Sequence, residues 1–540
     1  MKSKQTVLMI ILSLVLGLSA CNVPAAPTTP PTADNAESVE SGVTPSNTPA
    51  PSIPEPTPTP VVDTSMYTPE IASTTTEVIY EQYQRVGLGG RDTFFWPDGN
   101  IGFIPLDDGQ FRFFGANGSR TAVSVGTLDD PGAVMESHKL VIAGIDPEFS
   151  YAAGGPIYRD PESGLLLLFY HAERHLGGNG LIFHAAIGLA VSEDDGATFE
   201  NLGIIIETNA LPDRNAVCCA DVGGATYTIK DGDFLVYFRD RMEDLSTIEL
   251  AVASAPVDEV LAAAKSGNTS PWTKYHQDGP QPGLFGTSSP LEIGNPPTDW
   301  FHVSYNTALE RYVMVIATHD RAEEYNYQLY LTTSVDGYTW SPRVLLLEME
   351  DEITYPSLIS VEGDPLNSSQ DFYIYYVTTP RGTTRWHNTT FHRMTVSLTG
   401  EMLEPKRGWE FDTDPEGWTP LWEMDSFEVQ DGVLIIQSAG NDPHMVSPAT
   451  AISSDTYKQI EVRMKVGAGA IGQFFFTTQD VPFHVEEASL VFPLERSDEF
   501  VTYTVDMSAV PAWTGTIGDL RFDPTDQAAT IEIDYIRFIP

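Results

Sequence analysis

Acidic, imidazole and guanidinium side chains recur where apolar runs of this sequence begin or end. Hydrolysis of a glycosidic bond needs one carboxylic acid that is kept protonated and a second carboxylate that is ionised on the other side of the sugar. Asp98 and Asp221 come from different repeats of the chain and could supply the two sides, with Glu173 as a third candidate. Side chains that could bind the hydroxyl groups of a sugar are Asp92, His171, His175, Arg239, Asp240, His319 and Tyr355.

A repeated β unit must position these side chains. Five units lie between about Asp92 and Gly400, at a spacing of about sixty residues, and each has an apolar strand, a tight turn, a second strand and a third strand further on. Five such units without helices between them favour a five-bladed β-propeller over a long β-sandwich or a β-solenoid. The segment 77–86 could add an outer strand to the last blade and seal the ring, and only 257–264 is expected to form a helix.

Two turn motifs support this blade architecture. Ser192 to Phe199 reads SEDDGATF, and Ser334 to Trp340 reads SVDGYTW, which is one residue shorter. Both fit the Asp box, in which the Asp accepts backbone N–H bonds, the Gly takes a positive φ and the aromatic ring packs between strands. We therefore expect these carboxylates to be structural.

The geometry of a propeller sorts the remaining polar groups by face. The start of each first strand and the end of each second strand share one face, whereas the Asp boxes and the turns DDG, PESG and KDG fall on the other. Each of the five units then delivers charged or hydrogen-bonding groups to the same rim. Such a rim suits sugar recognition, which uses polar partners for hydroxyls and flat rings for sugar faces.

The N-terminal region predicts export. Lys2 and Lys4 precede an apolar run at 7–18 that is too short to span a bilayer comfortably, and Leu-Ser-Ala-Cys ends at Cys21. This resembles the bacterial lipoprotein signal, which implies cleavage before Cys21 and lipidation of its thiol; the alternative is an ordinary secretory signal. A stalk rich in Pro and Thr follows, so we expect a protein on the extracellular face of the cell membrane, attached only through lipid.

Charge limits the partners. The formal net charge is -46, which argues against nucleic acid and anionic membrane surfaces as partners because both are polyanions. The polar rim described above predicts a carbohydrate substrate or ligand, and its chemistry requires no cofactor. We expect four regions: a signal peptide with its lipidation site at 1–21, a disordered stalk at 22–70, the propeller at 71–404 and a β-sandwich at 405–540.

After position 404 the pattern changes to a new set of alternating strands. Residues 411–418 read FDTDPEGW, and later segments read WTGTIGDLRFDP and IDYIRF. This order resembles the jelly-roll carbohydrate-binding modules of secreted polysaccharide enzymes. Trp418, Trp422 and Trp513 could stack on sugar or pack in a core. Asp412, Asp523 and Asp534 could hold a structural calcium with backbone oxygens.

The five-unit region resembles the five-bladed β-propeller glycoside hydrolases and related sugar-active proteins. PDGNIGFIPLDDGQFRFFGAN is similar to their first blade, which implies the role of the catalytic Asp for Asp98, with Asp92 as competitor, and the third-blade acid would fall on Asp221. The third blade departs from the pattern, because it begins Asp-Val-Gly-Gly where many members have Glu-Gly-Pro. A surface-anchored glycoside hydrolase is therefore expected, with a non-catalytic glycan-binding lipoprotein and a sialidase-like hydrolase as alternatives.

Cys218 and Cys219 are the only cysteines besides Cys21. An exported protein meets an oxidising environment, and a lipidated Cys21 would leave these two only each other. We expect either a vicinal disulfide that forms a stiff apolar patch beside Asp221 or two buried thiols.

Overall fold

The computed structural model describes residues 64–84, 97–176, 183–209, 222–241, 248–291, 293, 298–319, 327–383, 387–478, 481, 483–497 and 499–540. Cys21, Asp92, Cys218, Cys219 and Asp221 lie outside these ranges, as do the predicted signal segment and most of the predicted stalk. Within the described ranges, no helix is long and apolar enough to cross a membrane.

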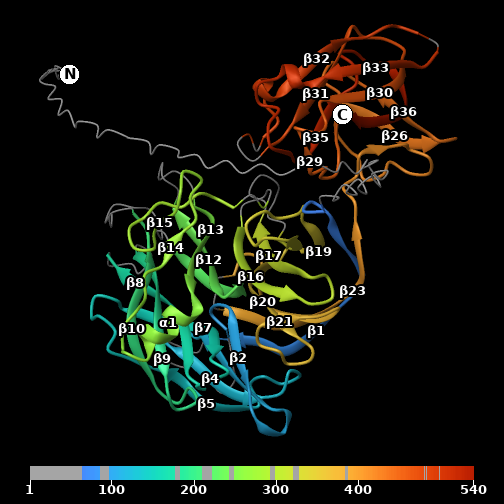
Figure 1. The fold of residues 1–540 in the computed structure, drawn as a ribbon. Helices are drawn as coiled ribbons and strands as arrows, with labels where there is room; N and C mark the ends of the chain where they lie inside the picture. The colour runs from blue at the N-terminus through green and yellow to red at the C-terminus, as the bar shows by residue number, and fades with distance from the viewer. Residues whose placement is uncertain are drawn as a thin grey trace, which may run out of the picture. The chain divides into compact units, whose positions relative to one another are not determined.

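The described residues up to Leu403 form five largely antiparallel sheets, the blades, in chain order (Figure 1). Their middle strands are almost wholly apolar because they are covered on both faces; Leu166 to Tyr170, for example, are all buried. The first blade is β2 (Ile101–Pro105), β3 (Phe111–Ala116), β4 (Thr121–Gly126) and β5 (Val134–Leu140). The second is β7 (Tyr151–Arg159), β8 (Leu166–His175), β9 (Phe183–Ser192) and β10 (Phe199–Glu207), with β6 (Ile142–Ala143) on its outer edge.

The other three blades vary this plan. The third is β11 (Gly223–Lys230), β12 (Asp233–Arg241), β13 (Ile248–Pro256), β14 (Thr273–Lys274) and β15 (Gln281–Pro282), with the expected helix α1 (Val257–Ala264) after β13. The fourth is β16 (Thr298–Asn306), β17 (Arg311–His319), β18 (Tyr327–Ser334) and β19 (Val344–Met349). The fifth is β20 (Glu352–Ser360), β22 (Asp371–Thr379), β23 (His387–Leu403) and β1 (Thr68–Gln84).

Five apolar clusters lie between consecutive blades and close the ring. Four of them join the first blade to the second and so on to the fifth. The last packs Phe103 and Phe113 of the first blade against Tyr355, Tyr375 and Phe391 of the fifth. The five-bladed propeller predicted from the sequence is therefore confirmed.

The N-terminal strand seals this ring, as the sequence predicts. β1 pairs with β23 in antiparallel register from Thr68 to Gln84, and in Figure 1 the blue strand lies beside the orange one. Arg393 of β23 donates to Glu77 on β1 and, at 2.7 Å each, to the carbonyl of Leu128 and to Asp129 near the first blade. One guanidinium thus joins the closing strand to the blade where the ring began.

Replacing Arg393 with Met should lower the free energy of unfolding by about 2–3 kcal/mol, because charge-assisted hydrogen bonds of a buried guanidinium are lost. Urea unfolding followed by circular dichroism measures this. Lys230→Met, which removes an exposed ion pair with Asp231, is the control and should change stability by less than about 1 kcal/mol. Equal effects of the two substitutions would contradict a role for Arg393 in closing the ring.

Both Asp boxes have the predicted structural role. Asp194 accepts from the backbone N–H of Thr198 at 2.9 Å and from its hydroxyl at 2.7 Å, and these bonds hold the pKa of Asp194 below its ordinary value. Gly196 has a φ of 84°, and Phe199 is buried. Asp336 accepts from two backbone N–H groups in the same way.

Residues from Gly408 onward form a β-sandwich of two sheets. The core between them contains Trp409, Trp418 and Trp513. Trp418 and Trp513 are therefore core residues, whereas Trp422 is 59% exposed. One sheet is β26 (Met424–Gln430), β27 (Val433–Ser438), β36 (Thr530–Ile539), β30 (Gln459–Val466) and β33 (Val501–Asp506), with β24 (Gly408–Trp409) beside β36. The other is β25 (Thr419–Trp422), β28 (His444–Val446), β35 (Leu520–Asp523), β31 (Ile471–Phe476) and β32 (Ser489–Pro493), and β29 (Ile452–Ser453) pairs separately with β34 (Thr516–Ile517).

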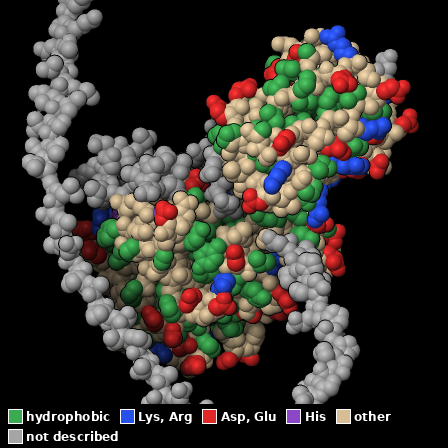
Figure 2. Space-filling model, turned by 45° about the horizontal axis from the view of Figure 1, so that its top comes forward, with side chains coloured by type: hydrophobic (Ala, Val, Ile, Leu, Met, Phe, Trp, Pro, Cys, Tyr) green, Lys and Arg blue, Asp and Glu red, His purple; other side chains and the backbone are tan. Residues whose placement is uncertain are grey.

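Acidic side chains are spread over the surface of the described residues. Figure 2 shows Asp and Glu on both the propeller and the sandwich, in keeping with the strongly negative net charge. A surface with this excess of carboxylates repels other polyanions over about a Debye length.

Candidate active site

Asp98 lies where the inner strands of three blades converge. Its Oδ2 accepts from the backbone N–H of Gly118 at 2.9 Å, and the hydroxyl of Tyr151 is 3.5 Å from the same oxygen. The hydroxyl of Tyr355 donates to Oδ1 at 3.2 Å. Blades one, two and five thus each direct a donor at this carboxylate, which accepts all three as an ionised carboxylate can.

The segment that follows Asp98 is tied across the centre of the propeller. The amide of Asn100, which is buried, donates to the carbonyls of Phe301 at 2.9 Å and Pro356 at 2.7 Å. The backbone N–H of Ile101 donates to the hydroxyl of Ser357 at 2.9 Å. These bonds to blades four and five fix the entry of β2, and therefore fix Asp98.

Tyr355 begins a row of side chains that crosses three blades. It is 3% exposed, and its φ of 56° lies in the left-handed region that non-glycine residues rarely adopt. Its ring centroid is 4.4 Å from that of Trp300, and the guanidinium of Arg239 lies over the Trp300 ring at 4.8 Å from its centroid. Gly223 leaves room for this arginine, because a Cβ there would come within 2.8 Å of its Nη2.

The strain at Tyr355 is evidence about its role. A bulky residue held at positive φ costs about 1–3 kcal/mol and persists only where the surroundings enforce it. Here the strained backbone places the phenol on Asp98 and the ring on Trp300. Strain of this kind clusters at ligand-binding sites.

The second blade contributes an imidazole–carboxylate–imidazole group. His171, Glu173 and His175 alternate along β8, and each imidazole Nε2 lies 3.2 Å from a different oxygen of Glu173. The Nδ1 of His175 is 2.5 Å from the hydroxyl of Ser150. Tyr151 connects this group to Asp98, since its ring lies 5.8 Å from that of His171. The predicted residues Asp98, Tyr355, His171 and Glu173 thus form one connected network through Tyr151.

Asp240 lies apart from this network, inside the third blade. It is 1% exposed, and its carboxylate accepts from Lys274 at 2.6 Å, from Ser288 at 2.7 Å and from the backbone N–H of Arg241 at 2.9 Å. Lys274 also donates to the carbonyls of Glu207 and Gly286. The structure therefore places Asp240 in a buried ion pair and not on the rim.

Of the other predicted residues, Asp92 and Asp221 lie outside the described residues, and the side chain of His319 is not described. Two residues of the network were missed by the sequence analysis, Tyr151 and Trp300. Both stand at the start of an inner strand, which is the same signal that identified Tyr355 in the fifth unit.

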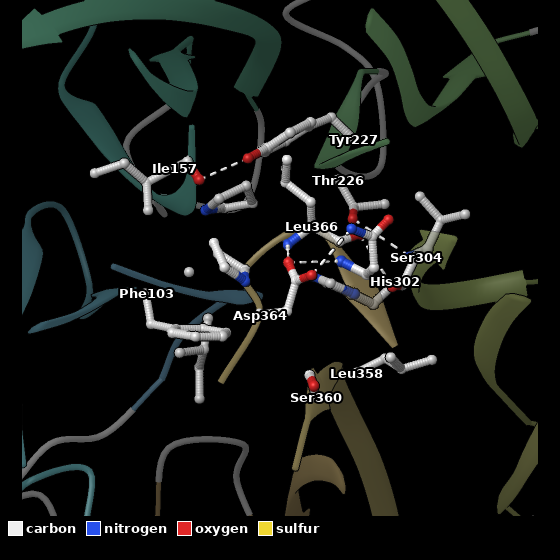
Figure 3. A pocket seen from close by; sticks show the side chains of 16 residues that line it. Phe103, Ile157, Thr226, Tyr227, His302, Ser304, Leu358, Ser360, Asp364 and Leu366 are labelled. Atoms are coloured by element: carbon white, nitrogen blue, oxygen red, sulfur yellow. Dashed lines mark hydrogen bonds between the residues drawn. The ribbon is translucent and has the colours of Figure 1, made fainter. Parts of the chain in front are cut away.

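The central channel of the propeller, which the inner strands line, is nearly filled. The loop between β20 and β22 folds into it, and β21 (Asn367–Ser368) pairs in parallel with β16. Asp364 caps this loop by accepting from the backbone N–H groups of Leu366 and Asn367. Figure 3 shows Asp364, Leu366, His302 and Ser304 grouped around the remaining cavity of about 30 Å³, which has room for a water molecule or two but not for a sugar.

His302, enclosed in this channel, predicts a pH dependence of stability. Burial lowers its pKa to about 4 from an ordinary 6.5, so the unfolded state takes up the proton first as the pH falls. Stability should therefore drop between pH 6.5 and 4, by at most about 3 kcal/mol. His302→Gln should remove this part of the pH dependence in urea unfolding at pH 4.5 and 7.0. Equal losses in the two proteins would contradict the assignment to His302.

No group of three His, Cys, Asp or Glu side chains able to hold a metal ion occurs in the described part of the chain. In the sandwich, Asp523 pairs with Arg521 and Asp534 with Arg463, so two of the three carboxylates proposed for a calcium ion already have cationic partners.

Comparison with solved structures finds chains that this one resembles distantly. No protein-family description and no curated protein matches the chain. An exo-β-1,3-galactanase from Phanerochaete chrysosporium, solved with galactose, is 9% identical with a TM-score of 0.34 over 82% of this chain and 96% of that one. A glycoside hydrolase family 43 arabinoxylan arabinofuranohydrolase from Bacillus subtilis is 10% identical with a TM-score of 0.30 over 82% and 96%. The catalytic domain of an α-L-arabinofuranosidase from Coprinopsis cinerea is 11% identical with a TM-score of 0.36 over 63% and 98%.

Proposed function

We propose that the protein is a glycoside hydrolase that acts on extracellular oligo- or polysaccharide. The observation that carries this proposal is Asp98, a carboxylate held by donors from three blades at the convergence of the inner strands. Beside it, Trp300 and Arg239 offer an aromatic ring and a guanidinium to a sugar, and the buried ring of Tyr355 packs against Trp300. From the N-terminal sequence alone, we further propose that lipidated Cys21 anchors the protein outside the cell.

In this mechanism Asp98 is the base. Hydrolysis adds water across the glycosidic bond: Asp98 accepts the proton of the attacking water, and a carboxylic acid on the far side protonates the departing oxygen. Glu173 and Asp221 are the candidates for that acid. Glu173 is connected to Asp98 through His171 and Tyr151. Its two oxygens contact the imidazoles of His171 and His175.

A second candidate function is glycan binding without catalysis. It is favoured by the same contacts of Glu173, because a carboxylate engaged by two imidazoles is less available to donate a proton to a leaving group. In that case the rim would bind a glycan, and the lipoprotein would retain it at the cell surface for another protein.

A screen on plant and microbial glycans separates the two functions. The hydrolase should release reducing sugar from at least one glycan, and Asp98→Asn should abolish the release. Binding of a glycan by calorimetry with no release from any member of a broad panel would refute the hydrolase and support the binding protein.

Tyr355→Phe should lower kcat about tenfold, because it removes one donor to Asp98 and keeps the aromatic contact with Trp300. Steady-state kinetics on the best glycan of the screen measures this. Tyr373→Phe, a phenol that packs against Arg393 in the fifth blade, is the control and should leave kcat unchanged. A kcat of Tyr355→Phe equal to that of the wild type would show that the hydroxyl does not serve Asp98.

A further inference from the structure

Phe285 is an exposed aromatic residue with a strained backbone. Three aromatic residues in the described part of the chain have a positive φ: Phe285 (61°), Tyr355 (56°) and Phe411 (54°). Phe411 is buried in the core of the sandwich, and Tyr355 is buried with its phenol on Asp98. Phe285, by contrast, is 65% exposed. Burial of its ring therefore does not offset the strain, and residues that are strained without a gain in packing are typical of ligand-binding sites.

Backbone hydrogen bonds fix the Phe285 loop, residues 283–288, across the seam between blades two and three. The N–H of Phe285 donates to the carbonyl of Glu207 at 3.2 Å, and the N–H of Glu207 donates to the carbonyl of Gly283 at 3.0 Å. A Cβ at Gly283 would lie 2.5 Å from the carbonyl oxygen of Ile205, so the loop packs directly on the backbone of β10. Two blades thus hold the exposed ring in one position.

The Phe285 loop is connected to the end of blade three that contributes to the candidate active site. Ser288 of the loop donates to Asp240 at 2.7 Å, and Lys274, which pairs with Asp240, donates to a carbonyl of the loop at 2.9 Å. Asp240 follows Arg239 on β12, and the guanidinium of Arg239 lies over the ring of Trp300. The loop therefore belongs to the same end of blade three as the arginine of the candidate active site.

The apolar surface of the loop matches one sugar ring. A stable protein interface buries about 800 Å² on each partner, whereas an aromatic side chain buries about 150–250 Å², so Phe285 and the 43% exposed Leu284 are too small a surface for a protein partner. The net charge of -46 disfavours an anionic membrane. A sugar ring has an apolar face that stacks on an aromatic ring. Because the ring of Phe285 is already fixed, this stacking costs little conformational entropy.

We infer that Phe285 stacks on a sugar unit of a long glycan, remote from the bond at which Asp98 acts, and so selects long chains over short ones. The inference rests on the proposed function and deepens it, because it names chain length as the property of the substrate that this residue recognises. The contact is the same in the bound substrate and in the transition state. It should therefore lower KM for long chains and leave kcat unchanged.

Phe285→Leu tests the flat ring, because leucine keeps an apolar side chain and the strained backbone but has no face for stacking. Steady-state kinetics uses oligosaccharides of graded length, cut from the polysaccharide on which the screen finds turnover. Phe285→Leu should raise KM for the long members about fivefold. It should leave KM for the disaccharide, and kcat for every member, unchanged. Phe285→Tyr keeps the ring and should behave as the wild type does.

Tyr275→Leu is the matched control. Tyr275 is an exposed aromatic residue of the same blade, but its ring packs 5.4 Å from that of Tyr338, so its loss should leave KM unchanged at every chain length. Phe285→Gly tests the strain, since glycine adopts a positive φ readily. This variant should unfold at a temperature no lower than the wild type and show the same rise in KM. A lower unfolding temperature would show that the ring serves the fold and would contradict the argument from strain.

The outcomes separate this inference from the hydrolase. Turnover with equal KM in Phe285→Leu and the wild type at every chain length would overturn the role of Phe285 and leave the hydrolase standing. If the screen finds binding without turnover, the hydrolase falls, and calorimetry with the long oligosaccharides decides: fivefold weaker binding by Phe285→Leu supports the role, and wild-type affinity overturns it. A panel with neither binding nor turnover would overturn both. Binding to phosphatidylcholine vesicles, or self-association, that Phe285→Leu abolishes would assign the ring to a membrane or to a second copy of the chain and would also overturn the inference.

Discussion

Asp98→Asn should lower kcat by about 10²–10⁴-fold, the contribution typical of a general base. The amide has the shape of the carboxylate but cannot take a proton from water. It should also keep the fold, because one amide oxygen can still accept from Gly118 and the NH₂ group can donate to the hydroxyl of Tyr355. KM should therefore change only severalfold, as expected when a group acts mainly in the transition state.

A matched substitution in the same blade controls for loss of charge. Asp108 lies in the DDG turn at the opposite end of β2 and has a φ of 64°, a conformation that Asn tolerates as well as Asp. Asp108→Asn should retain wild-type kcat and stability. If Asp98→Asn turns over glycan as fast as Asp108→Asn does, Asp98 is not the base and another carboxylate must be sought.

Local patterns allowed most of the fold to be predicted. The sequence predicted the first and second strands of the five units, the helix at 257–264 and the strand that seals the ring. Each of these elements depends on alternation or on a continuous apolar run. The parallel pairing of β21 with β16 was not, since it joins Asn367 to Tyr305 across two units. Such pairs depend on how the blades meet, which no short window of sequence contains.

The site was predictable where position along the strand decides it, and not where the direction of the side chain decides it. Asp98 precedes the inner strand β2, Tyr355 lies in the first half of the inner strand β20, and the two side chains meet. Arg239 and Asp240 are adjacent on β12 and therefore point to opposite sides of the blade: Arg239 lies against Trp300, whereas Asp240 shares the side of Phe238. Lys274, the partner of Asp240, lies 34 residues further along the chain. A rule about strand ends does not predict this pairing.

This buried pair gives the largest expected effect on stability. Lys274, which is fully buried, has all three ammonium hydrogens engaged, by Asp240 and by the carbonyls of Glu207 and Gly286. Lys274→Met would leave the Asp240 carboxylate in the interior with Ser288 and a backbone N–H as its remaining partners among the described residues. We expect the free energy of unfolding of the propeller to fall by about 3–5 kcal/mol, the usual result of removing one partner of a buried ion pair.

The double substitution distinguishes an uncompensated charge from lost packing. With Asp240→Leu added to Lys274→Met, no buried charge of the pair remains, so stability should recover much of the loss. The four proteins form a cycle in urea unfolding followed by circular dichroism. Additive losses would show that the two residues act independently. If the folded double variant also binds glycan with wild-type affinity, the carboxylate of Asp240 supports the third blade from within and contributes nothing to the rim, because a direct ligand of the sugar could not be replaced by leucine without loss of affinity.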